Sequence, residues 1–136
     1  MKISSLKVDT QKIEVGEWIG SIPGLEGVRL KVRGSSCKAW REMTQRLVAA
    51  VPRGKRKNNM IPVDEQDRIN RVVMREVGLL DWEGIEDDDD KPIPYSKAKA
   101  DEYLNADYPD FRDGVLWACN AVGVAAEDDA EETAKN

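Results

Sequence analysis

The chain has 136 residues, of which 40% are hydrophobic and 35% are charged, and its formal net charge is −5. This length fits a single domain, and the negative charge gives no general reason to bind nucleic acid. Histidine is absent, so the commonest general base near neutral pH and the commonest metal ligand are both missing.

The charges divide the chain into a basic and an acidic part. Residues 1–60 hold 13 Lys/Arg and 5 Asp/Glu, a net charge of +8, whereas residues 61–136 hold 8 and 21, a net charge of −13. A chain divided in this way can pair its two parts internally or stack head to tail with copies of itself. It is therefore a candidate for homo-oligomerisation.

The first regular pattern in the chain is typical of a β-hairpin. Hydrophobic and charged residues alternate from residue 12, and Pro23-Gly24 is a strong turn signal. The alternation resumes over residues 28–33, where three basic residues share one face of the expected strand. We predict a half-buried hairpin within residues 12–33, with strands at 12–22 and 27–33.

Four later segments have the three- and four-residue hydrophobic spacing of amphipathic helices. Ser35 or Ser36 is the expected N-cap of the first helix, and Ser96 is the expected N-cap of the third. Gly78 is expected to end the second helix in a left-handed conformation, and Pro109 to lie in the first turn of the last. The predicted helices span residues 36–51, 63–77, 96–105 and 109–123.

The stretch between the second and third helices has its own pattern. Residues 79–85 are mostly apolar, with Trp82 among them, and we expect them to be extended and available to join the sheet. Five acidic residues follow at 86–90. They do not form an EF-hand loop, because the positions that need glycine and glutamate hold Pro92 and Ala98. We interpret the acidic run as a solvated turn.

A basic loop is expected at residues 52–61. It contains Arg53, Lys55, Arg56 and Lys57 and no acidic residue. Such a loop can contact a phosphate backbone or an acidic partner, and it can equally be a solvated connector. No aromatic residue is present to stack on bases, so nucleic acid is not the favoured partner.

Together these patterns predict an α+β domain in which the N-terminal hairpin packs on a mainly helical bundle. We expect residues 1–10 to be a flexible arm, residues 11–125 to form the domain, and residues 126–136 to be a disordered acidic tail. There is no signal-peptide pattern and no membrane-spanning apolar run, so a cytoplasmic location is expected. We find no nucleophile with a base, no phosphate-binding motif and no metal-ligand spacing. We therefore expect neither an enzyme nor a cofactor, metal or small-molecule substrate.

Several motifs, in their order along the chain, resemble the tail assembly chaperones of long-tailed bacteriophages and prophages. The resemblance covers roughly residues 12–125. It rests on EWI at 17–19, RLKVR at 29–33, AWR at 39–41, LDWEGI at 80–85, the acidic turn, KPIPYS at 91–96 and YPDFRD at 108–113.

The resemblance implies a non-enzymatic protein in the cytoplasm of the bacterial host. Such proteins are thought to bind the long, helical tape-measure protein and to help the tail-tube protein polymerise around it. A structural subunit that stays in the tail or head–tail junction is an alternative, and so is a small nucleic-acid-binding regulator.

Residue type indicates the candidate partner-binding residues. Aromatic side chains are enriched at interface hot spots, and basic side chains suit an acidic partner. For each aromatic residue, a place in the core is the competing interpretation. The candidates are Trp82, Tyr95, Phe111 and Trp117, with Arg53, Lys55, Arg56 and Lys57.

Overall fold

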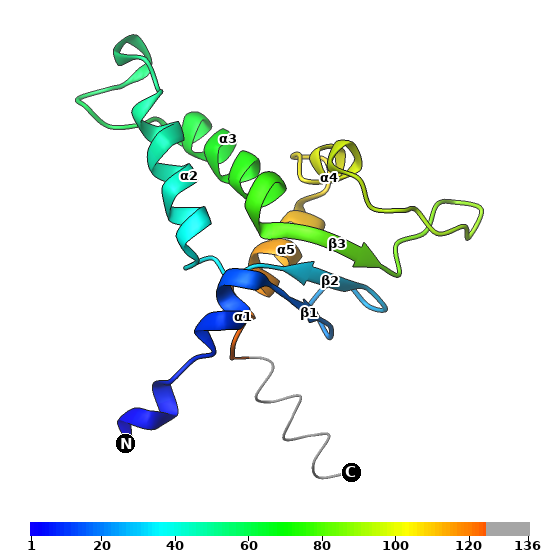
Figure 1. Ribbon diagram of the computed structural model, residues 1–136. Coiled ribbons are helices and arrows are strands. Elements are labelled where there is room, and N and C mark those ends of the chain that lie inside the picture. Colours follow the sequence, from blue (N-terminus) through cyan, green and yellow to red (C-terminus); the bar gives the residue numbers. More distant parts are fainter. Residues whose placement is uncertain (125–136) are drawn as a thin grey trace.

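The computed structural model describes residues 1–124 and has a three-stranded antiparallel sheet (Figure 1). The strands, in their order across the sheet, are β1 (Glu17–Ile19), β2 (Arg29–Val32) and β3 (Leu79–Glu83). Leu30 in the central strand faces Ile19 on one side and Trp82 on the other, and all three are buried. On the opposite face Arg29 pairs with Glu83 at 2.6 Å, so the expected alternation of β2 is confirmed.

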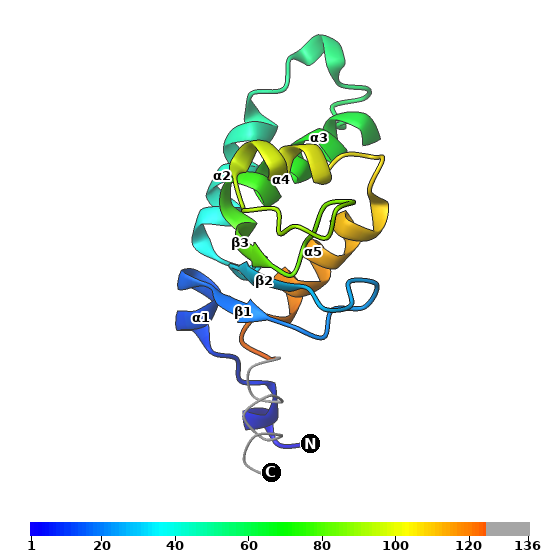
Figure 2. The same ribbon diagram turned by 90° about the vertical axis from the view of Figure 1, so that its right-hand side faces the viewer.

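Helices pack against this sheet and against one another. Helix α2 packs beside α3, and α5 packs against β2 (Figures 1 and 2). The helices are α1 (Thr10–Val15), α2 (Lys38–Ala49), α3 (Val63–Val73), α4 (Lys97–Tyr103) and α5 (Pro109–Ala121), with a π-helical turn (Met74–Gly78) and short 3₁₀ turns (Ile3–Leu6 and Arg53–Lys55). The predicted α+β class is confirmed, and residues 79–83 do join the sheet.

The first strand of the predicted hairpin was wrong over residues 12–15, which belong to α1. The Asp9 side chain accepts a hydrogen bond from the Lys12 amide at 3.1 Å and so caps this short helix. Gly16, with φ 105°, ends it. Apolar residues two positions apart in sequence also occur in helices, so the alternation over residues 12–15 did not distinguish a strand from a helix.

The start of α2 also differs from the prediction. Cys37, and neither Ser35 nor Ser36, is the N-cap, and its Sγ accepts a hydrogen bond from the Trp40 amide at 3.4 Å. The thiol is fully buried, so one side chain both caps the helix and fills the core. Two later predictions are confirmed: Ser96 caps α4 and accepts a hydrogen bond from the Lys99 amide, and Pro109 lies in the first turn of α5.

Gly78 does not take the left-handed conformation that we expected. The helix instead passes through the π-helical turn directly into β3. A Cβ at Gly78 would lie 2.8 Å from the Trp40 ring and 3.3 Å from the Cys119 sulfur. The position therefore needs glycine because α2 and α5 approach it closely.

The core lies between one face of the sheet and the helices, and it is entirely apolar among the described residues. Its largest fully buried side chains are Ile19, Leu30, Leu79, Leu104, Val32, Val73, Val115, Cys37 and Cys119. Residues 1–10 are exposed, and the flexibility expected for them stays a prediction. The predicted tail at 126–136 lies outside the described residues.

Candidate functional site

An aromatic cluster is centred on Trp82. The ring centroids of Tyr95, Tyr103 and Phe111 lie 5.1, 5.9 and 6.0 Å from that of Trp82. The indole Nε1 donates to the Ile93 carbonyl at 2.7 Å. Trp82 is 5% exposed, which favours the core interpretation for this residue over partner binding.

Tyr95 is also occupied within the chain. It packs edge-on against Trp82, and its hydroxyl donates to the Leu79 carbonyl at 3.2 Å. Burial raises the pKa of this phenol above its ordinary value. Tyr95 therefore attaches the exit of the acidic turn to β3, and partner binding by it stays a prediction.

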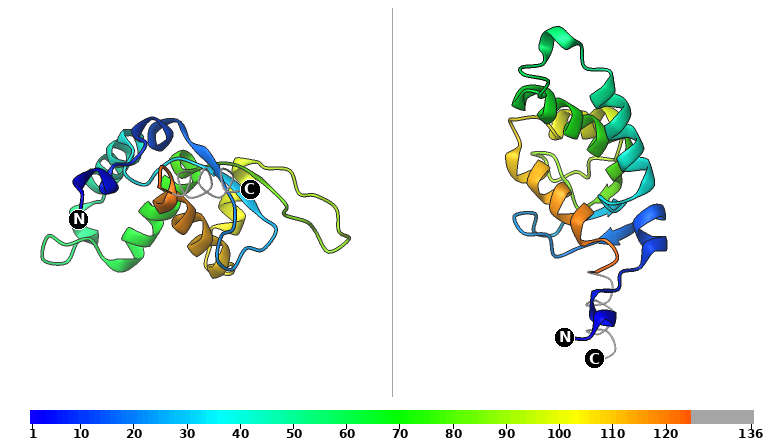
Figure 3. Two further views of the ribbon diagram at one scale, coloured as in Figure 1. Left: turned by 90° about the horizontal axis from the view of Figure 1, so that it is seen from below. Right: turned by 90° about the vertical axis from the view of Figure 1, so that its left-hand side faces the viewer.

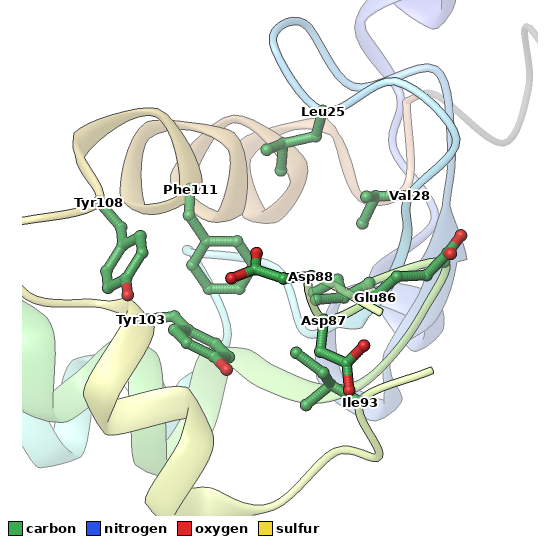
Figure 4. Close-up of a pocket in the computed structure, with 11 residues that line it drawn as sticks. Leu25, Val28, Glu86, Asp87, Asp88, Ile93, Tyr103, Tyr108 and Phe111 are labelled. Atoms are coloured by element: carbon green, nitrogen blue, oxygen red, sulfur yellow. The ribbon is translucent and has the colours of Figure 1, made fainter. Parts of the chain in front are cut away.

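Phe111 contributes to an open pocket of about 530 Å³ (Figure 4). Tyr103 and Tyr108 form the wall beside it, with their ring centroids 5.2 Å apart. The other apolar lining residues are Leu25, Val28, Ile85 and Ile93. Three carboxylates complete the lining: Glu86, Asp87 and Asp88. The pocket is thus aromatic and aliphatic inside and acidic on one side.

The acidic side of the pocket has a defined backbone. The Asp87 side chain accepts hydrogen bonds from the Asp89 and Lys91 amides at 2.8 and 3.0 Å. Within residues 1–124, none of the carboxylates of Glu86, Asp87 and Asp88 forms an ion pair with a base. The pocket therefore has negative charge that the described part of the chain does not neutralise.

The loop between β1 and β2 forms one side of this pocket through Leu25 and Val28. Ile22 is buried, and Leu25 lies over α5 at Gly114, where a Cβ would overlap the Leu25 side chain. On the other side, Gly84 (φ 89°) lets the chain pass close to the backbone of Gly27. The two glycines thus allow both sides of the pocket to form.

The four basic candidates lie together on a loop that projects beyond α2 and α3 (Figure 1). Arg56 donates to the carbonyls of Val48 and Val51 at 2.7 and 3.3 Å and so satisfies groups at the end of α2. Lys55 lies 3.6 Å from Glu65. Arg53 and Lys57 are exposed and form no ion pair within the described residues.

Trp117 lies on the outer side of α5, away from the pocket lining. It is 41% exposed, and its neighbour Leu116 is 42% exposed. Leu116 borders a hollow of about 200 Å³ between α3 and α5, with Met74, Asp67, Asn70, Arg112 and Asp113. Sequence reasoning did not select Leu116, or Tyr103 and Tyr108 of the pocket. The signal for Leu116 was its position beside Trp117 in a helix that is apolar around much of its circumference.

Ion pairs connect the π-helical turn to α4. Arg75 bonds to Asp101 at 2.8 Å and to Glu76 at 3.1 Å, and Lys97 bonds to Glu76 at 2.8 Å. The hydrogen bond from Lys97, together with that from Arg75, holds the pKa of Glu76 below its ordinary value. These charges stabilise the fold and are not free for a partner.

The described residues show neither a metal-binding cluster nor a membrane span. No group of three or more His, Cys, Asp or Glu side chains is placed to hold a metal ion within residues 1–124. No helix in that range has the length and apolarity to cross a membrane.

Comparison with known proteins gives one match, to a protein family. No curated protein and no solved structure matches the chain. The family described as YdaY prophage protein matches residues 35–136. Because this match covers three quarters of the sequence, the chain belongs to the YdaY prophage protein family.

Proposed function

We propose that this prophage protein is a non-enzymatic tail assembly chaperone. It binds a helical segment of the tape-measure protein on the outer face of α5 and assists polymerisation of the tail tube in the cytoplasm of the bacterial host. The prophage family and the order of motifs along the chain support this proposal. The observation that carries it is the exposed pair Leu116 and Trp117 on a helix whose opposite side closes the core.

The two sides of α5 differ in burial. Phe111, Val115 and Ala118 are buried on the inner side, so the helix is held rigidly. On the outer side, Leu116 and Trp117 remain about two-fifths exposed. Covering a large apolar side chain is worth roughly 1.5–3 kcal/mol when its burial is complete. An exposed Trp beside a Leu on a fixed helix is therefore a suitable contact for the apolar face of a partner helix.

The hollow beside Leu116 suits the same partner. Met74 lies at its base and is 3% exposed, while Arg112 and Asp113 are at its border. A partner helix can place an apolar side chain against Leu116 and orient its own charges toward Arg112 and Asp113. Masking one apolar face of a long helical protein in this way would keep it soluble before assembly.

The test is co-expression of the full chain with the tape-measure protein encoded nearby, followed by pull-down and light scattering. We expect a soluble complex that forms only when this chain is present. Trp117→Ala should weaken it about 30-fold, because truncating a hot-spot Trp costs about 2 kcal/mol or more. Val15→Ala is the matched control, since Val15 is 62% exposed on α1, away from the proposed contact.

Two results would contradict the proposal. The first is failure of the two proteins to form a complex, and the second is a complex with the same affinity for the Trp117→Ala and Val15→Ala chains. Recovery of the chain from purified phage particles would instead support a structural subunit of the tail or head–tail junction.

A nucleic-acid-binding regulator is the second candidate, favoured by Arg53 and Lys57, which are exposed and form no ion pair within residues 1–124. Its test is retention on heparin or DNA at low salt, with steep loss as salt rises. Failure to bind at low ionic strength would eliminate it.

A further inference from the structure

We propose that copies of this chain join head to tail, with the turn at residues 57–60 of one copy docked in the acid-sided aromatic pocket of the next. This inference does not rest on the proposed function, because it uses neither Leu116 nor Trp117. Both contacting surfaces belong to the chain itself.

The turn is a rigid two-residue hairpin at the end of the basic loop. The Lys57 amide donates to the Met60 carbonyl at 3.0 Å, and the Met60 amide donates to the Lys57 carbonyl at 2.8 Å. Asn58 and Asn59 have φ values of 52° and 62°, the left-handed conformation that a type I′ turn requires. Arg56 fixes the base of the loop on α2.

This geometry gives the turn a specific pair of side chains. Directly opposed residues of a hairpin project from the same face, so Lys57 and Met60 lie side by side. Met60 is 71% exposed, and the Lys57 ammonium has no ion-pair partner within residues 1–124. The turn therefore presents one apolar and one cationic side chain together, and neither is buried or ion-paired in the described part of the chain.

The pocket has the complementary chemistry. Its aromatic wall of Tyr103, Tyr108 and Phe111 favours a methionine sulfur and an ammonium group through sulfur–aromatic and cation–π contacts. Lys99 already lies over the Tyr103 ring at 5.9 Å, which shows such a contact within the chain. Glu86, Asp87 and Asp88 add negative charge beside the wall (Figure 4).

The pocket is also of suitable size. Pockets of roughly 300–1,000 Å³ hold whole drug-sized ligands, and this one, at about 530 Å³, accommodates two long side chains.

The two surfaces lie at opposite ends of the molecule. The loop that carries the turn and the acidic turn project to opposite sides of the molecule in Figure 1 and in the left view of Figure 3. Among the described residues, only the ion pairs Arg29–Glu83 and Lys55–Glu65 connect the basic residues 1–60 to residues 61–124. Within one copy, much of the charge on the described residues of the two parts is therefore not ion-paired. A contact between unlike surfaces at opposite ends is heterologous and extends to an open chain of copies.

The experiment measures the mass of the full chain by light scattering over a range of concentrations at low salt. A turn variant, Lys57→Ser with Met60→Ser, removes one surface, and a pocket variant, Glu86→Lys with Asp88→Lys, removes the other. All four positions are exposed, and circular dichroism checks that both variants fold. Lys7→Glu, a charge reversal on the exposed N-terminal arm, is the control.

We expect the wild-type chain and Lys7→Glu to grow in average mass with concentration, and added salt to reverse this by screening the charges. Each surface variant alone should be monomeric, with the junction weakened at least tenfold. An equimolar mixture of the two variants should form a 1:1 dimer and nothing longer, because it contains a single competent turn–pocket junction.

A wild-type chain that stays monomeric at every concentration would overturn the inference. So would a variant that still dimerises alone, since this would indicate a symmetric contact elsewhere. The Trp117→Ala chain should self-associate normally, so loss of self-association and loss of tape-measure binding are separate results.

Discussion

Replacing Trp82 by Phe tests whether the central tryptophan belongs to the core. Its indole Nε1 donates the hydrogen bond that the Ile93 carbonyl accepts, and its ring is 95% buried among three other aromatic rings. Losing the donor removes a part-buried hydrogen bond, which costs about 0.5–1.5 kcal/mol. The smaller ring leaves a void that costs about 1 kcal/mol more. We expect Trp82→Phe to lower the free energy of unfolding by about 1.5–2.5 kcal/mol.

The assay is urea unfolding followed by far-UV circular dichroism, with Trp117→Phe as the matched control. Trp117 is 41% exposed, so the same substitution there should change the free energy of unfolding by no more than about 0.5 kcal/mol. The slope of that free energy with urea should be unchanged in both variants. A loss below about 1 kcal/mol for Trp82→Phe, or equal losses at the two positions, would refute the assignment of Trp82 to the core.

Three further predictions concern other parts of the fold. Gly84→Ala should lower the free energy of unfolding by at least about 2 kcal/mol in the same urea assay, which is about the cost of left-handed strain together with a backbone clash. The clash arises because a Cβ at this position would overlap the carbonyl of Gly27. Gly54→Ala is the control and should not destabilise the protein, because a Cβ there would meet no other atom. The hydrogen bond from Lys97 is the main cause of the lowered pKa of Glu76. A lowered carboxyl pKa stabilises the fold at pH values above the ordinary pKa, and this stability is lost as the pH falls through the lowered value. In Glu76→Gln, the free energy of unfolding should therefore fall less steeply as the pH is lowered. The same dependence of this free energy on pH in the variant and the wild-type chain would contradict the prediction. Burial raises the pKa of the Cys119 thiol to about 12. Because both cysteines are also inaccessible in the core, a thiol reagent at pH 8 should label neither of them in the native protein and both after denaturation.

Local sequence signals predicted the structure correctly where a single residue determines the backbone conformation. Ser96 and Pro109 mark helix starts because a hydroxyl accepts an amide proton and a proline needs none. The alternation around Leu30 identified β2 because one face of the sheet is buried and the other is charged. At residues 12–15 the signal was too short to distinguish the two periods, and the Asp9 cap decided for a helix.

Features that depend on packing could not be predicted in this way. The π-helical turn has no sequence signature, and Gly78 is needed for the approach of Trp40 and Cys119. The pocket combines four separate segments: the loop before β2, the acidic turn, the end of α4 and the start of α5. The aromatic residues could be selected by type, but their division into core, pocket wall and exposed surface depends on the tertiary fold.

The aromatic cluster also determines how loss-of-function variants must be interpreted. Tyr103 and Phe111 contact Trp82 on one side and line the pocket on the other, so the pocket wall is part of the core. A substitution of Trp82 that abolished partner binding would therefore act through the shape and stability of the wall, without showing contact by Trp82. Trp117 has no such connection, because no aromatic partner contacts its ring within residues 1–124. Among the aromatic candidates selected from the sequence, Trp117 is the one whose loss can report directly on a partner interface.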